Sequence, residues 1–296
     1  GGRAIIPAHF QNTAARMNIE RTLQYPRVLS IAGSDSGGGA GIQADLKTFA
    51  ALGCFGMTAI TALTAQNTCG VRAIHGVPPG MLRDQIDAVV EDIGVDAVKI
   101  GMLHSPEIVR TVAQAIDRVV FDPVMVATSG AKLIDDPAIA VLVAELFPRA
   151  ALITPNLDEA SLLVGRQLTS PQDMAQAATE LVARGARAVL LKGGHLVGDK
   201  VIDVLLQSGA EPLWMEADRI HTANTHGTGC TLSSAIAAHL ALGATLVQAV
   251  RQARDFVRQA LLAGAAVKTG AGSGPLNHGF APLPMHTRGA AMLAVF

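Results

Sequence analysis

A loop with two glycines in the last third of the chain carries the residues best suited to chemistry. The segment 224–230 reads NTHGTGC, and an apolar run with helical spacing begins at Cys230. Gly227 and Gly229 let backbone amides approach a ligand closely. The unpaired amides and the dipole of a helix N-terminus attract anions. We therefore predict an anion-binding loop (the anion loop, residues 224–230), the alternative being a plain turn before a buried cysteine.

Cys230 stands at the start of that predicted helix, where the field of the helix is strongest. A helix N-terminus favours the thiolate form of a cysteine. We therefore expect Cys230 to accept a proton or to orient a hydroxyl group.

A second glycine cluster follows the first predicted strand. An apolar run at 27–33 passes into SDSGGGAG at 34–41 (the glycine-rich loop), and a helical pattern covers 42–52. The loop formally matches the dinucleotide fingerprint, but the next predicted strand, at 59–66, ends without the acidic residue that this fingerprint requires. NAD binding is therefore disfavoured, and so is a P-loop kinase, because no GxxxxGK[ST] motif occurs.

Strands alternate with helices between the two loops. Short apolar runs predict buried strands at 96–101, 119–124, 151–155 and 188–193, and helical patterns lie at 79–93, 105–117, 137–147 and 170–185. A hairpin is predicted at 201–207 and 212–220, followed by helices at 230–243 and 245–266. This order predicts an α/β fold with a mostly parallel sheet covered by helices on both faces. Ligands of such sheets bind beyond the carboxyl ends of the strands.

Composition limits the classes of partner. Half of the residues are hydrophobic and 16% are charged, which suits one large domain, placed at 27–280 between an extension at 1–26 and a tail at 281–296. A net charge of −1 with one Trp and one Tyr disfavours nucleic acid. Three cysteines without paired spacing fit a reducing cytosol. No long apolar run occurs, so we expect no membrane span.

Several motifs, taken in order, closely resemble the hydroxymethylpyrimidine and phosphomethylpyrimidine kinases of thiamine biosynthesis, which belong to the ribokinase-like superfamily. The similarity runs from Arg27 to Asn277, and its motifs lie at 31–47, 64–68, 99–102, 122–125, 154–159, 191–195 and 224–231. The resemblance implies a cytoplasmic homodimer that uses ATP and Mg²⁺. It would phosphorylate the hydroxymethyl group of 4-amino-5-hydroxymethyl-2-methylpyrimidine, and then convert the monophosphate to the diphosphate.

The resemblance also implies roles for single residues. It places the backbone of Gly227, Thr228, Gly229 and Cys230 around the transferred phosphoryl group, with Cys230 as general base. It implies that the pyrimidine is contacted by Asp45 and Gln66, walled by Met102 and Val124, and approached closely by Gly33 and Ala40. Asp45 read by itself is an exposed helix carboxylate, and Met102 and Val124 suit a hydrophobic core equally well.

On the nucleotide side, the resemblance assigns Lys192 and Asn156 to the phosphates. Glu159 and Asp122 are the implied Mg²⁺ ligands, directly or through water. A lone lysine after an apolar strand needs a negative partner, which phosphate supplies. Asn156 could equally cap the helix that follows it. We interpret three histidines without metal-ligand spacing as polar loop residues: His195, His221 and His226.

One departure and three alternatives remain. Many relatives carry Lys where Thr128 stands, so its role either passes to Lys132 or is absent here. Pyridoxal kinase is the nearest alternative function, because pyridoxal also presents a hydroxymethyl group on a nitrogen heterocycle. A non-catalytic pyrimidine-binding module is the alternative from another class. A sugar kinase is disfavoured, because it would be expected to carry Asp in place of Cys230.

Overall fold

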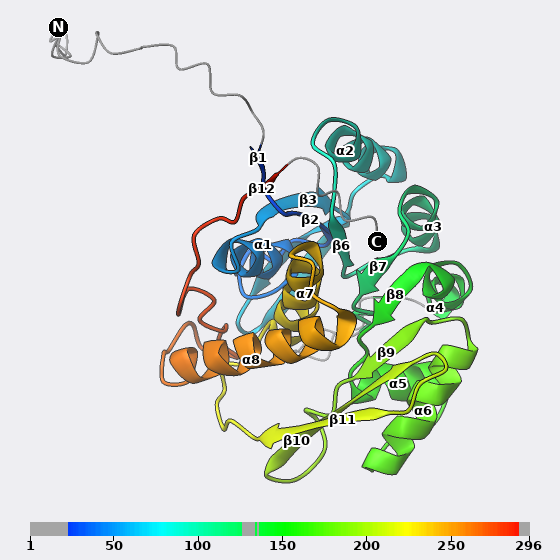
Figure 1. Cartoon of the computed structure of the whole chain (residues 1–296), viewed down its shortest axis with the longest axis vertical. Helices are drawn as coiled ribbons and strands as arrows, with labels where there is room; N and C mark the ends of the chain where they lie inside the picture. Colours follow the sequence, from blue (N-terminus) through cyan, green and yellow to red (C-terminus); the bar gives the residue numbers. More distant parts are fainter. Residues whose placement is uncertain (1–22, 126–133, 135, 290–296) are drawn as a thin grey trace, which may run out of the picture.

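A central eight-stranded sheet organises the fold (Figure 1). The computed structural model describes residues 23–125, 134 and 136–289. The sheet order is β11-β10-β9-β8-β7-β6-β2-β3, and neighbours from β9 to β3 run parallel. The hairpin β10–β11 continues the sheet antiparallel, as predicted. The strands are β2 (Arg27–Ala32), β3 (Phe55–Ile60), β6 (Ala97–Ile100), β7 (Val119–Phe121), β8 (Ala150–Ile153), β9 (Ala188–Leu191), β10 (Lys200–Gln207) and β11 (Leu213–Asp218).

Helices cover both faces of this sheet, which confirms the predicted fold class (Figure 1). Alternate residues of a strand point to opposite faces. In β2, Leu29 and Ile31 belong to one core cluster and Val28 to the other. Helices α1, α7 and α8 pack on the Val28 side, and the others pack on the opposite side. The helices are α1 (Gly41–Ala51), α2 (Pro79–Asp92), α3 (Pro106–Ala115), α4 (Asp136–Val141), α5 (Leu157–Val164), α6 (Pro171–Ala183), α7 (Thr228–Ala241) and α8 (Leu246–Gly264).

The helix predicted at 137–147 is not uniform. After α4 the chain forms a π-helical turn at Leu142–Leu146 and a 3₁₀ turn at Phe147–Arg149. Pro148 has no amide hydrogen to donate, so regular α-helical hydrogen bonding cannot continue through it.

A small antiparallel sheet of β4 (Ala62–Asn67) and β5 (Gly70–Gly76) stands apart from the main sheet. The prediction of one strand at 59–66 is wrong, because the chain turns at Thr61. Its hydroxyl donates to the Met102 carbonyl at 2.8 Å, and its amide donates to the Ala32 carbonyl. The turn carries β4, and with it Gln66, over the end of β2.

The two ends of the described chain pair with each other. The short strands β1 (Leu23–Gln24) and β12 (Arg288–Gly289) are antiparallel, and Arg288 forms an ion pair with Asp96. The part of the predicted tail that lies in 281–289 therefore packs on the domain, whereas the domain boundaries themselves stay a prediction. Among the described residues, no helix is long and apolar enough to cross a membrane. The expected cytosolic location stays a prediction.

Candidate active site

A cavity of about 600 Å³ lies beyond the carboxyl ends of the parallel strands. The glycine-rich loop, the anion loop, β10, β11 and α8 all contribute to its wall. It brings together the predicted site residues Gly33, Ala40, Gln66, Met102, Asp122, Val124, Asn156, Glu159, Lys192, Gly227, Thr228, Gly229 and Cys230. Asp45 does not line it. Thr128 and Lys132 lie outside the described residues.

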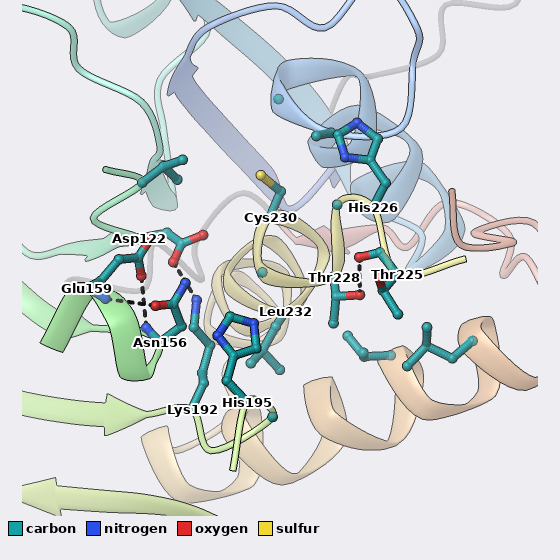
Figure 2. Close-up of a pocket in the computed structure, with 18 of the residues that line it drawn as sticks. Asp122, Asn156, Glu159, Lys192, His195, Thr225, His226, Thr228, Cys230 and Leu232 are labelled. Atoms are coloured by element: carbon teal, nitrogen blue, oxygen red, sulfur yellow. Dashed lines mark hydrogen bonds and ion pairs between the residues drawn. The ribbon is translucent and has the colours of Figure 1, made fainter. Parts of the chain in front are cut away.

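The anion loop has the geometry of an anion site. Helix α7 begins at Thr228, two residues before the predicted start, and Gly227 is its N-cap with a φ of 86°. The Thr228 hydroxyl donates to the Thr225 carbonyl at 2.7 Å (Figure 2). The amides of Gly229 and Cys230 belong to the first helical turn, where no carbonyl one turn earlier can pair with them. These amides can therefore bind phosphate oxygens.

Two glycines allow the two loops to touch. A Cβ on Gly227 would collide with the backbone carbonyl of Gly39, and a Cβ on Gly39 would collide with the ring of His226. The positive φ of Gly227 would by itself strain any other residue. The close contact of the glycine-rich loop and the anion loop thus requires glycine at both positions.

Cys230 is half-buried in the first turn of α7 (Figure 2). Burial raises the pKa of its thiol to about 11; the nearby Lys99 charge lowers that pKa, while Asp45 and Asp122 raise it. The expectation that the helix favours a thiolate here is therefore wrong, because desolvation outweighs the helix field. In this structure Cys230 is a neutral thiol.

Asp45 requires a second correction. Its side chain is fully buried, and its two oxygens accept from Lys99 Nζ at 2.9 Å, Ser30 Oγ at 2.5 Å and Ser234 Oγ at 2.6 Å. A carboxylate with this many donors has no exposed face for a ligand. Asp45 is therefore not an exposed helix carboxylate, and it has no free oxygen with which to contact the pyrimidine directly. Its ion pair holds Lys99 in place.

Lys99 is a site residue that the sequence analysis did not assign. It lies in the buried strand β6, and it lines the cavity with a side chain that is 0% exposed to solvent. Burial would lower its pKa, but the negative charge of Asp45 raises the pKa above the ordinary lysine value. Lys99 is therefore protonated. The signal was present, since a lysine in the middle of an apolar strand requires a buried anionic partner.

Asp122 and Lys192 form a second buried pair. Lys192 Nζ lies 2.8 Å from Asp122 Oδ1, which also accepts from Thr154 Oγ1 at 2.9 Å. The backbone amide of Lys192, just after β9, donates to the carbonyl of Pro155, just after β8, and so holds the ends of these two strands together. Lys192 Nζ also lies next to Gly229, so its charge faces the anion loop.

Glu159 and Asn156 are joined by a capping box. The Asn156 side chain accepts from the Glu159 amide at 2.8 Å, and Glu159 Oε2 accepts from the Asn156 amide at 2.8 Å (Figure 2). The capping alternative for Asn156 is thus confirmed. Burial raises the pKa of Glu159 to about 7; Lys192 opposes this increase and Asp122 adds to it.

The carboxylates of Asp122 and Glu159 fit a magnesium ion in chemistry. Both are hard oxygen donors that face the same cavity. Within the described ranges, no group of three or more His, Cys, Asp or Glu side chains could hold a metal ion alone. Water and phosphate oxygens would therefore have to complete the coordination shell, as is usual for Mg²⁺.

His226 is more than a polar loop residue. It is buried, and its Nε2 lies 2.9 Å from Asp35 Oδ2 and 3.4 Å from the Gln66 side-chain amide. The partners are 191 and 160 positions away in sequence, so local patterns could not reveal them. His195, by contrast, is exposed, and its Nδ1 lies 2.8 Å from Asp158 Oδ2, as expected for a polar loop residue.

The far side of the cavity was not foreseen. Apolar side chains of β10, β11, α7 and α8 line it: Val201, Ala217, Leu232, Val257 and Leu261. Below them, Asp203 accepts from the Gly193 amide at 2.8 Å and pairs with Arg254 Nε at 2.8 Å. This buried pair fixes β9, β10 and α8 relative to one another. No motif in the sequence marks these residues, because the wall is assembled from separate elements.

Known proteins resemble the chain over most of its length. A bifunctional thiamine biosynthesis protein of Geobacter sulfurreducens is 49% identical over 273 residues, covering 90% of this chain, which spans only 55% of that protein. A hydroxymethylpyrimidine/phosphomethylpyrimidine kinase of Rhizobium meliloti is 49% identical over 255 residues, covering 84% of this chain and 96% of that protein.

Solved structures and a family profile agree with this similarity. The ADP complex of Bacillus subtilis pyridoxal kinase is 38% identical, with a TM-score of 0.79 over 86% of this chain and 98% of that one. Residues 35–277 match the profile described as phosphomethylpyrimidine kinase. That range contains all but the first residue of the glycine-rich loop, the whole anion loop and both lysine–aspartate pairs. The chain belongs to the phosphomethylpyrimidine kinase family.

Proposed function

We propose that this protein is a kinase that transfers the γ-phosphoryl group of ATP to 4-amino-5-hydroxymethyl-2-methylpyrimidine and then to the monophosphate. The observation that carries the proposal is the placement of one anion loop between two differently lined halves of a single cavity. Gln66 and Met102 line one half, and Lys192 with an apolar wall lines the other.

The half next to the glycine-rich loop suits a small flat heterocycle. A Cβ on Gly33 would come within 3.1 Å of the Met102 methyl group, so glycine at this position leaves room for the Met102 side chain in the cavity wall. Met102 and Val124 supply apolar surface, with Ala40 on the loop. The Gln66 amide supplies a donor and an acceptor for a ring edge.

Phosphoryl transfer requires mainly positioning and neutralised charge. A bond forms between the substrate hydroxyl oxygen and the γ-phosphorus, and the bond from that phosphorus to the bridging oxygen breaks, so that ADP leaves. The hydroxyl proton passes to an oxygen of the transferred phosphoryl group. The amides of Gly229 and Cys230 hold the phosphoryl oxygens, and Lys192 neutralises their charge. Because the Cys230 thiol is neutral, we propose that it orients the hydroxyl as a hydrogen-bonding partner rather than as the base.

The nucleotide half combines the apolar wall of β10, β11 and α8 with the phosphate-facing Lys192. An adenine ring is flat and largely apolar, so this wall suits it. We propose that Asp122 and Glu159 hold Mg²⁺, which would supply charge stabilisation at the phosphates. Asn156 is proposed to keep Glu159 aimed at the cavity through the capping box.

We also propose a homodimer. Leu63 and Ile74 in the small sheet β4–β5 are 49% and 42% exposed, which leaves apolar surface on an element that stands apart from the main sheet. Sedimentation or light scattering of the purified chain tests this, and a concentration-independent monomer would contradict it.

Product analysis tests the proposed reaction. The protein is incubated with Mg·ATP and, separately, with the hydroxymethylpyrimidine, its monophosphate and pyridoxal, and products are identified by mass spectrometry. We expect both pyrimidines to be phosphorylated. Conversion of pyridoxal alone would favour a pyridoxal kinase, which the similarity to the Bacillus subtilis enzyme makes the second candidate. Absence of any product would favour a pyrimidine-binding module.

A further inference from the structure

The backbone of Gln66 is fixed on the glycine-rich loop. Gln66 lies at a bulge of β4, where the register with β5 shifts after Ala65. Ser36 Oγ accepts from the Gln66 amide at 2.8 Å and donates to the Gln66 carbonyl at 2.7 Å. A bulge re-aims a side chain, and here the side chain lines the cavity. The structure places the side-chain amide oxygen toward Thr64 and the nitrogen toward His226. The two atoms exchange places when the amide turns by 180°, so the hydrogen bonds around them decide which orientation is favoured.

The Asp35–His226 pair determines one end. The Asp35 carboxyl accepts from three backbone amides of its own loop, those of Gly37, Gly39 and Ala40. Burial raises the pKa of Asp35, but these bonds and the one from His226 lower it below its usual value, so the group is a carboxylate. A carboxylate can only accept, and therefore His226 Nε2 carries a hydrogen. The structure places the Gln66 amide nitrogen 3.4 Å from this Nε2. An N–H cannot donate to a ring nitrogen that carries its own hydrogen, so hydrogen bonding favours the exchanged orientation, with the carbonyl oxygen near His226 as a second, longer acceptor beside Asp35.

Thr64 determines the other end independently. Its hydroxyl has one hydrogen, which it donates to the Ser34 carbonyl at 2.8 Å. The other terminal atom of the Gln66 amide lies 3.3 Å from the same Thr64 oxygen. The structure places the Gln66 oxygen at this position. Because the Thr64 hydrogen is used in the shorter bond to Ser34, two oxygens would face each other without a hydrogen between them, so the exchanged orientation, with NH₂ donating to Thr64, fits better. The oxygen and the NH₂ group of an amide are nearly equal in size and shape, so hydrogen bonding decides between the two orientations.

We propose that Thr64, His226 and Asp35 are positioning residues that hold the Gln66 amide in one orientation, and so select which ring edge the kinase accepts. In this exchanged orientation the NH₂ group faces Thr64 and the oxygen faces His226, which leaves one N–H and one lone pair for a ligand. The inference rests on the proposed function in one respect, that Gln66 faces the pyrimidine.

The consequence is a choice between two ring edges. The substrate offers an acceptor at its ring nitrogen and a donor at the neighbouring amino group. Its 4-oxo analogue offers an N–H and an oxygen in the reverse order. In the same ring position, only one of the two patterns matches a fixed amide, whereas an amide that is free to flip matches both.

Titration calorimetry with the 4-amino compound and its 4-oxo analogue tests this. We expect the wild type to prefer the amino compound by roughly 10–100-fold, the range for one or two mismatched buried hydrogen bonds. Thr64→Val and His226→Leu should each reduce this ratio, and the double variant should bring it to within about 3-fold of unity. The conservative variants Thr64→Ser and His226→Gln keep a hydroxyl and an N–H donor at these positions, so each should retain the wild-type preference. Thr179→Val removes an exposed hydroxyl on α6 and serves as the matched control.

The outcomes separate positioning from packing. If Thr64→Val and His226→Leu weaken both compounds equally at an unchanged ratio, while thermal melts show folded protein, these residues only pack the loops and the inference is wrong. Gln66→Ala tests the premise separately. If it keeps the wild-type preference, Gln66 does not read the ring edge, and that part of the proposed function is wrong whatever the positioning variants do.

Discussion

Two lysine–aspartate pairs lie near Cys230, and they differ in how far each is exposed to solvent. In the pair Lys99–Asp45 both side chains are 0% exposed, and two serines complete the hydrogen bonding of the carboxylate. In the pair Lys192–Asp122 the lysine keeps 13% exposure and borders the anion loop. The first pair is closed to solvent, although Lys99 borders the cavity, whereas the second pair is partly open to it. Similar chemistry thus serves a structural purpose in one place and remains available to a ligand in the other.

Lys192→Met should produce the largest change in activity. The lost charge would otherwise neutralise the transferred phosphoryl group, so we expect kcat to fall by roughly 10²–10³-fold, as for loss of one transition-state contact. Stability should fall less than in the enclosed pair, by about 1–3 kcal/mol, because loss of the Lys192 amine lets cavity water reach the Asp122 carboxylate, which is 3% exposed in the intact pair. Steady-state kinetics and urea unfolding measure the two effects. Lys200→Met, which removes an exposed lysine paired with Glu216 and Asp218, is the control that should leave both nearly unchanged.

Lys99→Met is the same substitution in the enclosed pair, and its main effect should be on folding. Removing one partner leaves Asp45 charged and without water, which typically costs about 3–5 kcal/mol. Adding Asp45→Asn should recover part of that loss, because removal of both charges is much less harmful than removal of one. Urea unfolding of the single and double variants measures this. A Lys99→Met protein of wild-type stability would show that the two pairs are not different in kind.

Variants of Cys230 test whether the positive charges of Lys99 and Lys192 lower the pKa of the thiol enough to ionise it. Cys230→Ala should lower kcat by about 10–100-fold with little change in KM, the size expected for one orienting hydrogen bond. Cys230→Ser should keep most of the activity, since a hydroxyl can also orient the substrate. Cys69→Ser, at an exposed cysteine, is the control. If the serine variant is as slow as the alanine variant, the thiolate is the base after all.

The sequence predicted the scaffold and the loops more fully than it predicted the contacts between them. Apolar runs located the strands, and helical patterns located α6 and α8, which begin in the structure with capping boxes at Ser170 and Thr245. Pairs such as His226 with Asp35 join positions 191 residues apart, so no local pattern identifies them. The error at Cys230 has another cause. A helix N-terminus is visible in sequence, but the burial that overrides its effect on the thiol depends on the packing of the whole cavity.

Glu159 offers the smallest and most specific test, because it adjoins the open pair. Burial raises its pKa from the unfolded value of 4.5 to about 7, so between these values the folded protein holds a proton that the unfolded chain has released. Unfolding then releases a proton, and stability must fall as pH rises through this window and remain lower above it. Urea unfolding of the metal-free protein with chelator, at intervals from pH 5 to pH 8, should show this decrease. Glu159→Gln keeps an acceptor for the Asn156 amide but cannot ionise, so its stability should lose that part of the pH dependence. If wild type and variant change equally with pH, then the open pair and its cavity hydrate Glu159 well enough to keep its pKa near the ordinary value.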